Sequence, residues 1–211
     1  MNLYFAPLAC SLATRIALYE AGAPARFTEV DLKQHRVRSS GEDFFAINPL
    51  GQVPALAIDA QTVLTENTAV LQYVAECFPD AQLAPLSGLE RARLQQWLGF
   101  IGTELHKGIF IALLDPTSPD AARDYSRTKI PLRFNFLQDH FTAHDFVLER
   151  FSVADAYLVT LLNWSTVSGI DLKQWPAVAA YYQRMMQRPS VARACGEELT
   201  LYKEEQARHA R

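Results

Sequence analysis

The sequence predicts a small α/β domain over residues 1–80, a linker over residues 81–88 and an all-helical domain over residues 89–211. In the first 80 residues, short runs with alternating apolar positions are interspersed with helical stretches, whereas only helical periodicity follows residue 88. The segment between them starts at Pro79, contains Pro85 and has no apolar period, which is typical of a linker.

The first domain is predicted to follow the order βαβ and then ββα. Apolar positions along residues 11–21 indicate a helix that ends at Gly22. Residues 59–61 (DAQ) join two short strands as a hairpin, and Asn67 can cap the helix that follows. The predicted elements are strands at 2–5, 27–32, 53–58 and 62–65 and helices at 11–21 and 68–78, with residues 33–48 irregular.

The second domain is predicted to contain four helices and a short tail helix. Ser152 and Asp155 have the spacing of a capping box, with Asp155 in the third helical position. The predicted helices cover residues 89–114, 119–141, 152–168 and 176–188, with the tail beyond Pro189.

Composition narrows the class of protein. The chain has 211 residues and a formal net charge of −3, so it lacks the basic character of a nucleic-acid-binding protein. No uninterrupted apolar run approaches the roughly 20 residues that span a bilayer, and the N-terminus lacks a secretory signal pattern. The three cysteines are scattered, which argues against a disulfide framework. We therefore expect a cytoplasmic protein with no membrane or nucleic-acid partner.

One thiol, Cys10, stands at the mouth of the first helix. Unpaired N–H groups and the positive end of the helix dipole favour an anion there, so a thiolate at this position is stabilised and reactive. The residue three positions later is Ala13, which excludes a Cys-x-x-Cys dithiol cycle. Packing in the core explains Cys10 equally well, and we expect Cys77 and Cys195 to be such packing residues.

Two further stretches have features of a peptide-binding site. In residues 51–56 (GQVPAL), a cis Val53–Pro54 bond leaves the Val53 main chain free to pair with an added strand. In residues 64–69 (LTENTA), a carboxylate and a helix N-terminus can hold the charged ends of an α-amino acid. Each stretch also has a purely structural explanation, as the end of a loop and as a helix cap.

The histidines are less specific. His106, in residues 103–108 (TELHKG), lies on the long helix, where a lone histidine is more often structural. His140 and His144 share a helix face, but no third ligand is evident in the sequence, and we expect no metal site.

Taken together, these stretches resemble the cytosolic glutathione transferases, specifically the bacterial beta class. The resemblance implies a thioredoxin-like N-terminal domain followed by a helical-bundle C-terminal domain, and a homodimer. It also implies glutathione as co-substrate, no permanently bound cofactor, and a small hydrophobic electrophile as the second substrate. The segments that carry it are ACSLA at 9–13, NPLGQVPAL at 48–56, LTE at 64–66, TELHKG at 103–108 and FSVADAY at 151–157.

The resemblance assigns roles to individual residues. Cys10 lies beside the glutathione sulfur and can form a mixed disulfide with it, His106 reaches the same sulfur, and Ser11 is the alternative hydroxyl. The implied glutathione-binding residues are Cys10, His35, Gln52, Val53, Pro54, Glu66, Asn67, Gly99, Thr103, Glu104 and His106. From position, the electrophile pocket is expected at Leu8, Phe110, Leu113, Leu114 and Trp164.

The chain departs from the family pattern at four positions. His35 replaces a lysine, Asn67 a serine or glycine, and Gly99 an asparagine. These three bear on glutathione affinity, since a neutral imidazole is a weaker anion partner than an ammonium group. Leu148 replaces a glycine and bears only on folding.

Two functions stay open: a glutathione transferase that conjugates electrophiles and can also exchange disulfides through Cys10, or a transferase-like non-catalytic protein that binds apolar ligands or partners.

Overall fold

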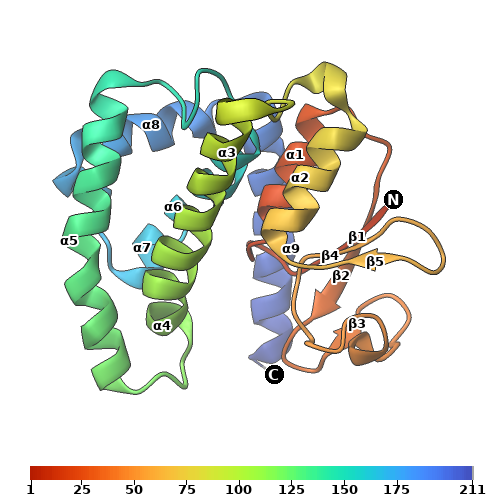
Figure 1. Cartoon of the computed structure of the whole chain (residues 1–211). Helices are drawn as coiled ribbons and strands as arrows, with labels where there is room; N and C mark the ends of the chain where they lie inside the picture. Colours follow the sequence, from red (N-terminus) through yellow and green to blue (C-terminus); the bar gives the residue numbers. More distant parts are fainter. Residues whose placement is uncertain (211) are drawn as a thin grey trace. The chain divides into compact units, whose positions relative to one another are not determined.

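Two units divide residues 1–210, the part of the chain that the computed structural model describes (Figure 1). The first unit consists of residues 1–83 together with the C-terminal helix α9 (Pro189–His209), and the second consists of residues 84–188. The sequence placed residues 189–211 in the helical domain as a short tail. The structure instead forms a helix of 21 residues there and groups it with the α/β unit.

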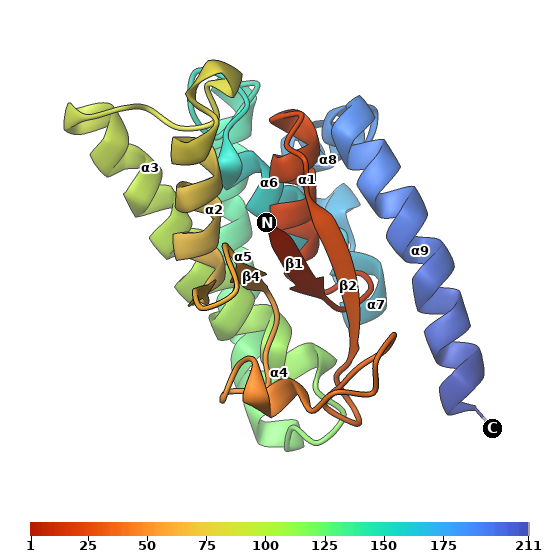
Figure 2. The same ribbon diagram turned by 90° about the vertical axis from the view of Figure 1, so that its right-hand side faces the viewer.

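A mixed sheet of five strands lies at the centre of the first unit, in the order β3-β2-β1-β4-β5. β1 and β2 run parallel (Figure 2), with Leu3 opposite Phe27, and the other neighbouring pairs are antiparallel. This arrangement confirms the predicted βαβ-ββα order. The strands are β1 (Asn2–Phe5), β2 (Arg26–Asp31), β3 (Arg36–Val37), β4 (Ala55–Ala57) and β5 (Val63–Leu64).

The helices of this unit agree with the prediction except at their ends and in one loop. α1 spans Leu12–Glu20, and α2 spans Asn67–Cys77. Glu66 occupies the N-cap position of α2, so the prediction that Asn67 caps this helix is wrong by one residue. The segment expected to be irregular contains β3 and a 3₁₀ helix (Phe44–Ala46), and a second 3₁₀ helix follows α2 at Pro79–Ala81.

Helix α9 is attached to the α/β unit along its length. Near its start, Ser190 donates a hydrogen bond to the Glu20 carboxylate at the end of α1. Near its end, Arg208 forms an ion pair of 2.5 Å with Glu29 on β2. These partners lie about as far from α9 in the sequence as the chain allows, which explains why the local pattern did not predict where α9 packs.

The second unit is helical throughout its regular elements, as predicted. Its first helix runs without interruption from Gly88 to Leu114 and comprises α3 (Gly88–Phe100), a π-helical segment (Ile101–Phe110) and α4 (Ile111–Leu114). The predicted helix at 152–168 is divided into two, because the chain turns at residues 163–164. The remaining elements are α5 (Asp120–Ala143), α6 (Val153–Leu162), α7 (Ser165–Ser168), a 3₁₀ turn (Leu172–Gln174) and α8 (Pro176–Met186).

The predicted capping box starts α6 and ties it into the core of the helical unit. Ser152 N–H and its hydroxyl donate to Asp155 Oδ2 at 2.9 and 3.0 Å. Val147 N–H and Tyr181 OH donate to Asp155 Oδ1 at 2.8 and 3.0 Å. Every residue of α6 is buried, so this capped helix is the centre around which the unit packs.

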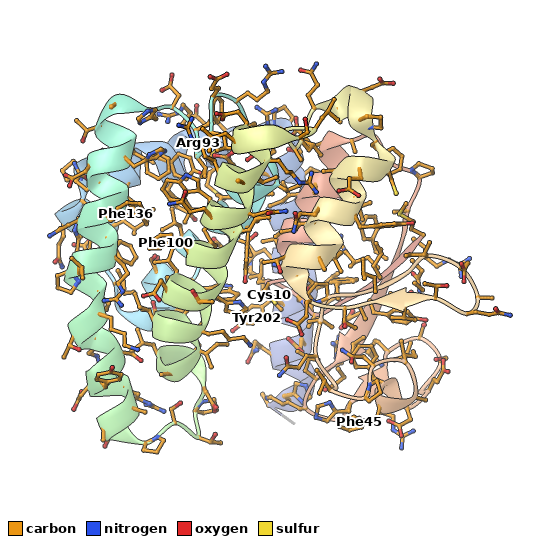
Figure 3. All side chains as sticks on the ribbon, viewed as in Figure 1. Cys10, Phe45, Arg93, Phe100, Phe136 and Tyr202 are labelled. Carbon is orange, nitrogen blue, oxygen red and sulfur yellow. The ribbon has the colours of Figure 1, made fainter. Side chains whose placement is uncertain are left out.

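Aromatic contacts join the long helix to α5. The rings of Phe100 and Phe136 point toward one another from α3 and α5 (Figure 3), with centroids 5.0 Å apart, and Trp97 contacts both rings.

By length and composition alone, the helix Gly88–Leu114 also qualifies as a membrane-spanning segment, a test that the core helices of soluble proteins pass as well. Its contacts with α5 and α6 mark it as a packed element of the helical unit.

Candidate functional site

Cys10 lies in the turn between β1 and α1, two residues before the helix begins (Figure 3). Its Sγ lies 3.2 Å from the Val53 carbonyl oxygen, to which it donates a hydrogen bond. The Val53–Pro54 peptide bond is cis. Within the described residues, no acceptor is found for the Val53 N–H. A thiol, a helix N-terminus and an unpaired main-chain donor thus meet in one place.

Ser11 braces this turn from the inside. The residue is fully buried, and its hydroxyl donates to the Ala6 carbonyl at 3.4 Å and accepts from the Ala6 N–H at 3.3 Å. The hydroxyl that we expected as an alternative to the Cys10 thiol is therefore engaged with the main chain.

His35 packs into the loop that leads to Val53. Its ring lies 4.4 Å from that of Phe45, and its Nδ1 is buried with no hydrogen-bond partner. Gly51, with φ of +62°, makes this packing possible, because a Cβ there would lie 2.7 Å from Phe45 and 2.8 Å from His35 Nδ1. Gln52 is exposed, and its carbonyl accepts a hydrogen bond of 2.7 Å from the Asn48 amide.

Glu66 and Asn67 point in different directions at the start of α2. Glu66 is exposed and adopts a φ of +64°, a conformation that residues with a side chain rarely adopt and that is often found at functional sites. Asn67 is buried, and its Oδ1 accepts a hydrogen bond of 3.3 Å from the Thr14 hydroxyl on α1. The first turn of α2 offers unpaired N–H groups to an anion, whereas the Asn67 amide is committed to the interior.

His106 lies on the π-helical segment of the other unit. Its Nδ1 is 2.7 Å from the Tyr157 hydroxyl on α6, and its ring lies 5.2 Å from that of Trp164. Burial, and to a lesser degree the neighbouring Lys107 charge, lowers the pKa of His106 to about 4. The imidazole is therefore neutral at pH 7 and can accept a proton or a hydrogen bond, but it does not act as a cation.

The other three predicted residues of the helical unit are exposed or half-buried. The Thr103 hydroxyl donates to the Gly99 carbonyl at 2.9 Å. Glu104 Oε2 accepts two hydrogen bonds from Arg133 on α5, from Nε at 3.0 Å and from Nη2 at 2.6 Å. Gly99 faces open space, since nothing lies within 4 Å of where its Cβ would be.

The other two cysteines differ from the expectation of two buried packing residues. Cys77 is exposed at the end of α2, so this expectation is wrong for it. Cys195 on α9 is partly buried, and burial, with a smaller contribution from the Glu198 charge, raises the pKa of its thiol to about 11. Cys195 therefore stays protonated at neutral pH.

The structure distributes the predicted site residues over both units. The α/β unit holds Cys10, Ser11, His35, Gln52, Val53, Pro54, Glu66 and Asn67, and the helical unit holds Gly99, Thr103, Glu104 and His106. Sequence reasoning missed the residues that hold them in place. Arg15 and Glu198 lie behind the Cys10 turn, while Tyr157 and Arg133 contact His106 and Glu104. A signal existed only for Arg15, a charged residue within an otherwise apolar helix face.

Comparisons with known proteins give the same family for both parts of the chain. Residues 1–76 match the family described as the glutathione S-transferase N-terminal domain, and residues 100–189 match the glutathione S-transferase C-terminal domain. The glutathione S-transferase GstA of Escherichia coli O157:H7 is 40% identical over 200 residues, which cover 94% of this chain and 98% of the relative.

Solved structures agree with these matches. A beta-class glutathione S-transferase of Sphingomonas chungbukensis is 43% identical, with a TM-score of 0.89, over 94% of this chain and 98% of its own. A sphingomonad glutathione S-transferase in complex with glutathione is 40% identical, with a TM-score of 0.88 and the same coverage. The similarity confirms the predicted thioredoxin-like domain followed by a helical domain.

Proposed function

Because the chain belongs to the glutathione S-transferase family, we propose that it is an enzyme that joins the sulfur of glutathione to small hydrophobic electrophiles. The observation that carries the proposal is the contact between the Cys10 thiol and the main chain of Val53, at a cis-proline and beside the N-terminus of α1. This arrangement can bind a thiol peptide by its backbone and hold its sulfur beside a helix N-terminus.

We place the tripeptide along residues 52–54. The unpaired Val53 N–H is a donor for the peptide main chain, and Glu66, exposed at the start of α2, is the partner for the γ-glutamyl ammonium group. The unpaired N–H groups of the first turn of α2 then suit the γ-glutamyl carboxylate. The Asn67 side chain contributes less than predicted, because Thr14 holds it inward.

The chemistry follows from stabilising a thiolate. The glutathione thiol loses its proton, the thiolate attacks the electrophilic carbon, a carbon–sulfur bond forms, and the leaving group departs with its electron pair. Helix N–H groups at Cys10 favour the anion. His106, neutral at pH 7 with its Nδ1 beside Tyr157, has the protonation state of a proton acceptor, and its action on this sulfur stays a prediction.

Cys10 supports a second activity, thiol–disulfide exchange. Its thiolate attacks a glutathione mixed disulfide, a Cys10–glutathione disulfide forms, and the substrate thiolate leaves. A second glutathione then reduces this intermediate and departs as glutathione disulfide, which regenerates Cys10. The free glutathione thiol supplies the reducing equivalent, and the glutathionyl group of the mixed disulfide becomes the other half of the glutathione disulfide, so no further reductant is required.

The remaining expectations also stay proposals. We propose a cytoplasmic homodimer that uses glutathione as co-substrate and needs no permanently bound cofactor, nucleic acid or membrane. Of the residues expected at the electrophile pocket, Phe110, Leu113, Leu114 and Trp164 lie within the helical unit. Among these, Phe110 and Trp164 form an edge-on ring contact with centroids 5.7 Å apart.

Calorimetric titration of glutathione into the wild-type chain and into Cys10→Ala tests the proposal first. We expect binding in the micromolar to low-millimolar range by the wild type, together with conjugation of a chloronitrobenzene. Cys10→Ala is expected to abolish disulfide exchange, while Cys77→Ala, on the exposed end of α2, serves as the matched control. Gly99→Asn restores a side chain of the family pattern in open space and is expected to tighten binding.

The alternative of a non-catalytic binding protein has one observation in its favour, the inward orientation of Asn67. If several millimolar glutathione produces neither heat nor thermal stabilisation, the transferase proposal fails and the alternative takes its place. Binding without turnover of any electrophile or mixed disulfide likewise refutes catalysis, while the glutathione site itself is retained.

A further inference from the structure

The turn that carries Cys10 is held by a residue from the other end of the chain. Glu198 lies on α9, and its Oε2 accepts a hydrogen bond of 2.7 Å from the Leu8 N–H. Leu8 has a φ of +58°, a left-handed conformation that is unfavourable for a residue with a branched side chain. Cys10 follows two residues later, so this contact acts directly on the turn that places the thiol.

The same carboxylate also holds the body of α1. Glu198 Oε1 forms an ion pair of 2.9 Å with Arg15 Nε, and both side chains are buried, with 0% and 4% of their surface exposed. The Arg15 guanidinium lies over the rings of Phe5 and Phe27, 4.2 and 4.3 Å from their centroids. Glu198 therefore connects α9 to the start of α1 and to its second turn.

Burying Glu198 has a large free-energy cost, and packing alone does not explain why the residue is buried. Burial raises the pKa of its carboxyl to about 8, while Arg15 and the Leu8 N–H oppose the shift and Glu197 adds to it. An apolar side chain of similar size would avoid this cost, but it would leave the Leu8 N–H without this acceptor and Arg15 Nε without its ionic partner. Glu198 is therefore matched to two specific partners, the Leu8 N–H in the Cys10 turn and the Arg15 guanidinium.

We propose that Glu198 is a positioning residue for the Cys10 thiol: by holding the Leu8 N–H, it keeps the turn left-handed and Cys10 at the N-terminus of α1. The inference rests on the proposed function in one respect, that Cys10 is the thiol of the glutathione site. It follows that the α/β unit requires helix α9, whose Glu198 is 190 residues from Leu8 in the sequence, to present its thiol correctly.

The test measures the reactivity of Cys10 itself, without glutathione. In a Cys77→Ser/Cys195→Ser background, Cys10 is the one remaining thiol of the chain. The rate of alkylation by iodoacetamide is measured across neutral pH, with the melting temperature of each variant. We expect Glu198→Met, which removes the acceptor of the Leu8 N–H whatever the protonation state of Glu198, to slow alkylation at pH 7 about tenfold, because a displaced thiolate loses the helix N–H groups that stabilise it.

Glu197→Met is the matched control, since Glu197 contacts Arg15 and, on its own helix, Arg193, but not Leu8. We expect it to change the rate less than about twofold, in line with a partly exposed ion pair. Glu198→Asp is the second variant if Glu198→Met does not fold. It keeps the charge beside Arg15 but shortens the reach to Leu8, and we expect a comparable loss of rate.

A rescue variant separates positioning from general stability. Glycine adopts a positive φ without a side-chain penalty, so Leu8→Gly lets the turn form with less help from Glu198. In the Glu198→Met background, we expect Leu8→Gly to recover most of the lost rate. A lower melting temperature with an unchanged Cys10 rate, or a loss that Leu8→Gly does not recover, would overturn the inference. Because the assay contains no glutathione, absent glutathione binding by the wild type refutes the proposed function and leaves this test decisive.

Discussion

Each unit of this chain contains a buried carboxyl group with several partners, and the two groups differ in how far away in the sequence these partners lie. Asp155 in the helical unit accepts four hydrogen bonds, and three of the donors lie within eight residues of it. Glu198 in the α/β unit takes its donors from residues 8 and 15, at the opposite end of the chain. Burial raises the pKa of both carboxyl groups, to about 6 and about 8.

The difference indicates what each carboxyl group contributes to the protein. Asp155 caps its own helix with uncharged donors and stabilises a core. Glu198 needs a cation and a strained turn, and its contacts reach the turn that carries the candidate thiol. A carboxylate whose hydrogen-bond donors are close in the sequence supports the folding of one helix. A carboxylate whose partners are distant in the sequence fixes the position of one element relative to another.

The largest effect on the free energy of unfolding is expected at Asp155, most of whose donors are close in the sequence. Asp155→Ala leaves two buried N–H groups and two buried hydroxyl groups without their acceptor, so we expect the free energy of unfolding to fall by about 3–5 kcal/mol. Urea denaturation of the full chain measures it. The control is Asp171→Ala, which removes an exposed cap that accepts from the Lys173 N–H, and its expected cost is about 1 kcal/mol. Equal losses at the two positions would break the comparison.

At Glu198, whose partners are distant in the sequence, Arg15→Met tests the contribution of the buried cation. It leaves the buried Glu198 carboxylate without its ionic partner and removes the contacts with Phe5 and Phe27. We expect a loss of about 3 kcal/mol in the free energy of unfolding, read from urea denaturation at pH 9, above the raised pKa of Glu198, where its carboxyl group is ionised. The exposed Arg193, paired with Glu197, is the control, and Arg193→Met should cost less than about 0.5 kcal/mol. A loss at Arg15 as small as that at Arg193 would show that the buried pair is not needed.

His106 extends the comparison to a buried base. Its folded pKa of about 4 lies below the ordinary value of 6.5, so the unfolded chain binds more protons between these pH values. Stability from this group is complete above pH 6.5 and is lost as the pH falls toward 4. We expect a loss on the order of 3 kcal/mol across that range.

The titration of Asp155 has the opposite sign in part of this range, since its raised pKa makes the folded chain bind more protons below about pH 6. The measurement is therefore the difference between the wild type and His106→Gln, by urea denaturation at several pH values. Parallel curves for the two proteins would refute the His106 assignment.

The smallest effects are expected at two glycines of one continuous helix. A Cβ on Gly108 would lie 2.8 Å from the Thr103 carbonyl oxygen, whereas a Cβ on Gly99 would meet nothing within 4 Å. We expect Gly108→Ala to cost about 1–2 kcal/mol through strain in the π-helical segment. Gly99→Ala should gain about 0.5–1 kcal/mol from helix propensity. Thermal unfolding of both variants decides, and a gain at Gly108 would contradict the geometry.

Local patterns predicted most of the elements. Period-two runs located β1, β2, β4 and β5, the Ser152–Asp155 spacing located the start of α6, and Gly22 marked the end of α1. The failures have local causes as well. β3 is two residues long, too short for a period, and the cap of α2 fell on Glu66, whose positive φ no propensity rule anticipates.

The candidate site was predicted as a set of separate residues, and the sequence by itself determined which types of chemistry were available: one thiol before a helix, a Val-Pro peptide, a carboxylate at a helix start and a histidine on a long helix. Such features depend on neighbours within a few positions, which is the range over which the chain's own geometry acts. Tertiary structure decided how each residue is used. It turned Ser11 and Asn67 inward, paired Glu104 with Arg133 and kept His106 neutral beside Tyr157. It also brought Glu198 to the turn that carries Cys10, because buried donors must find acceptors wherever the fold places them.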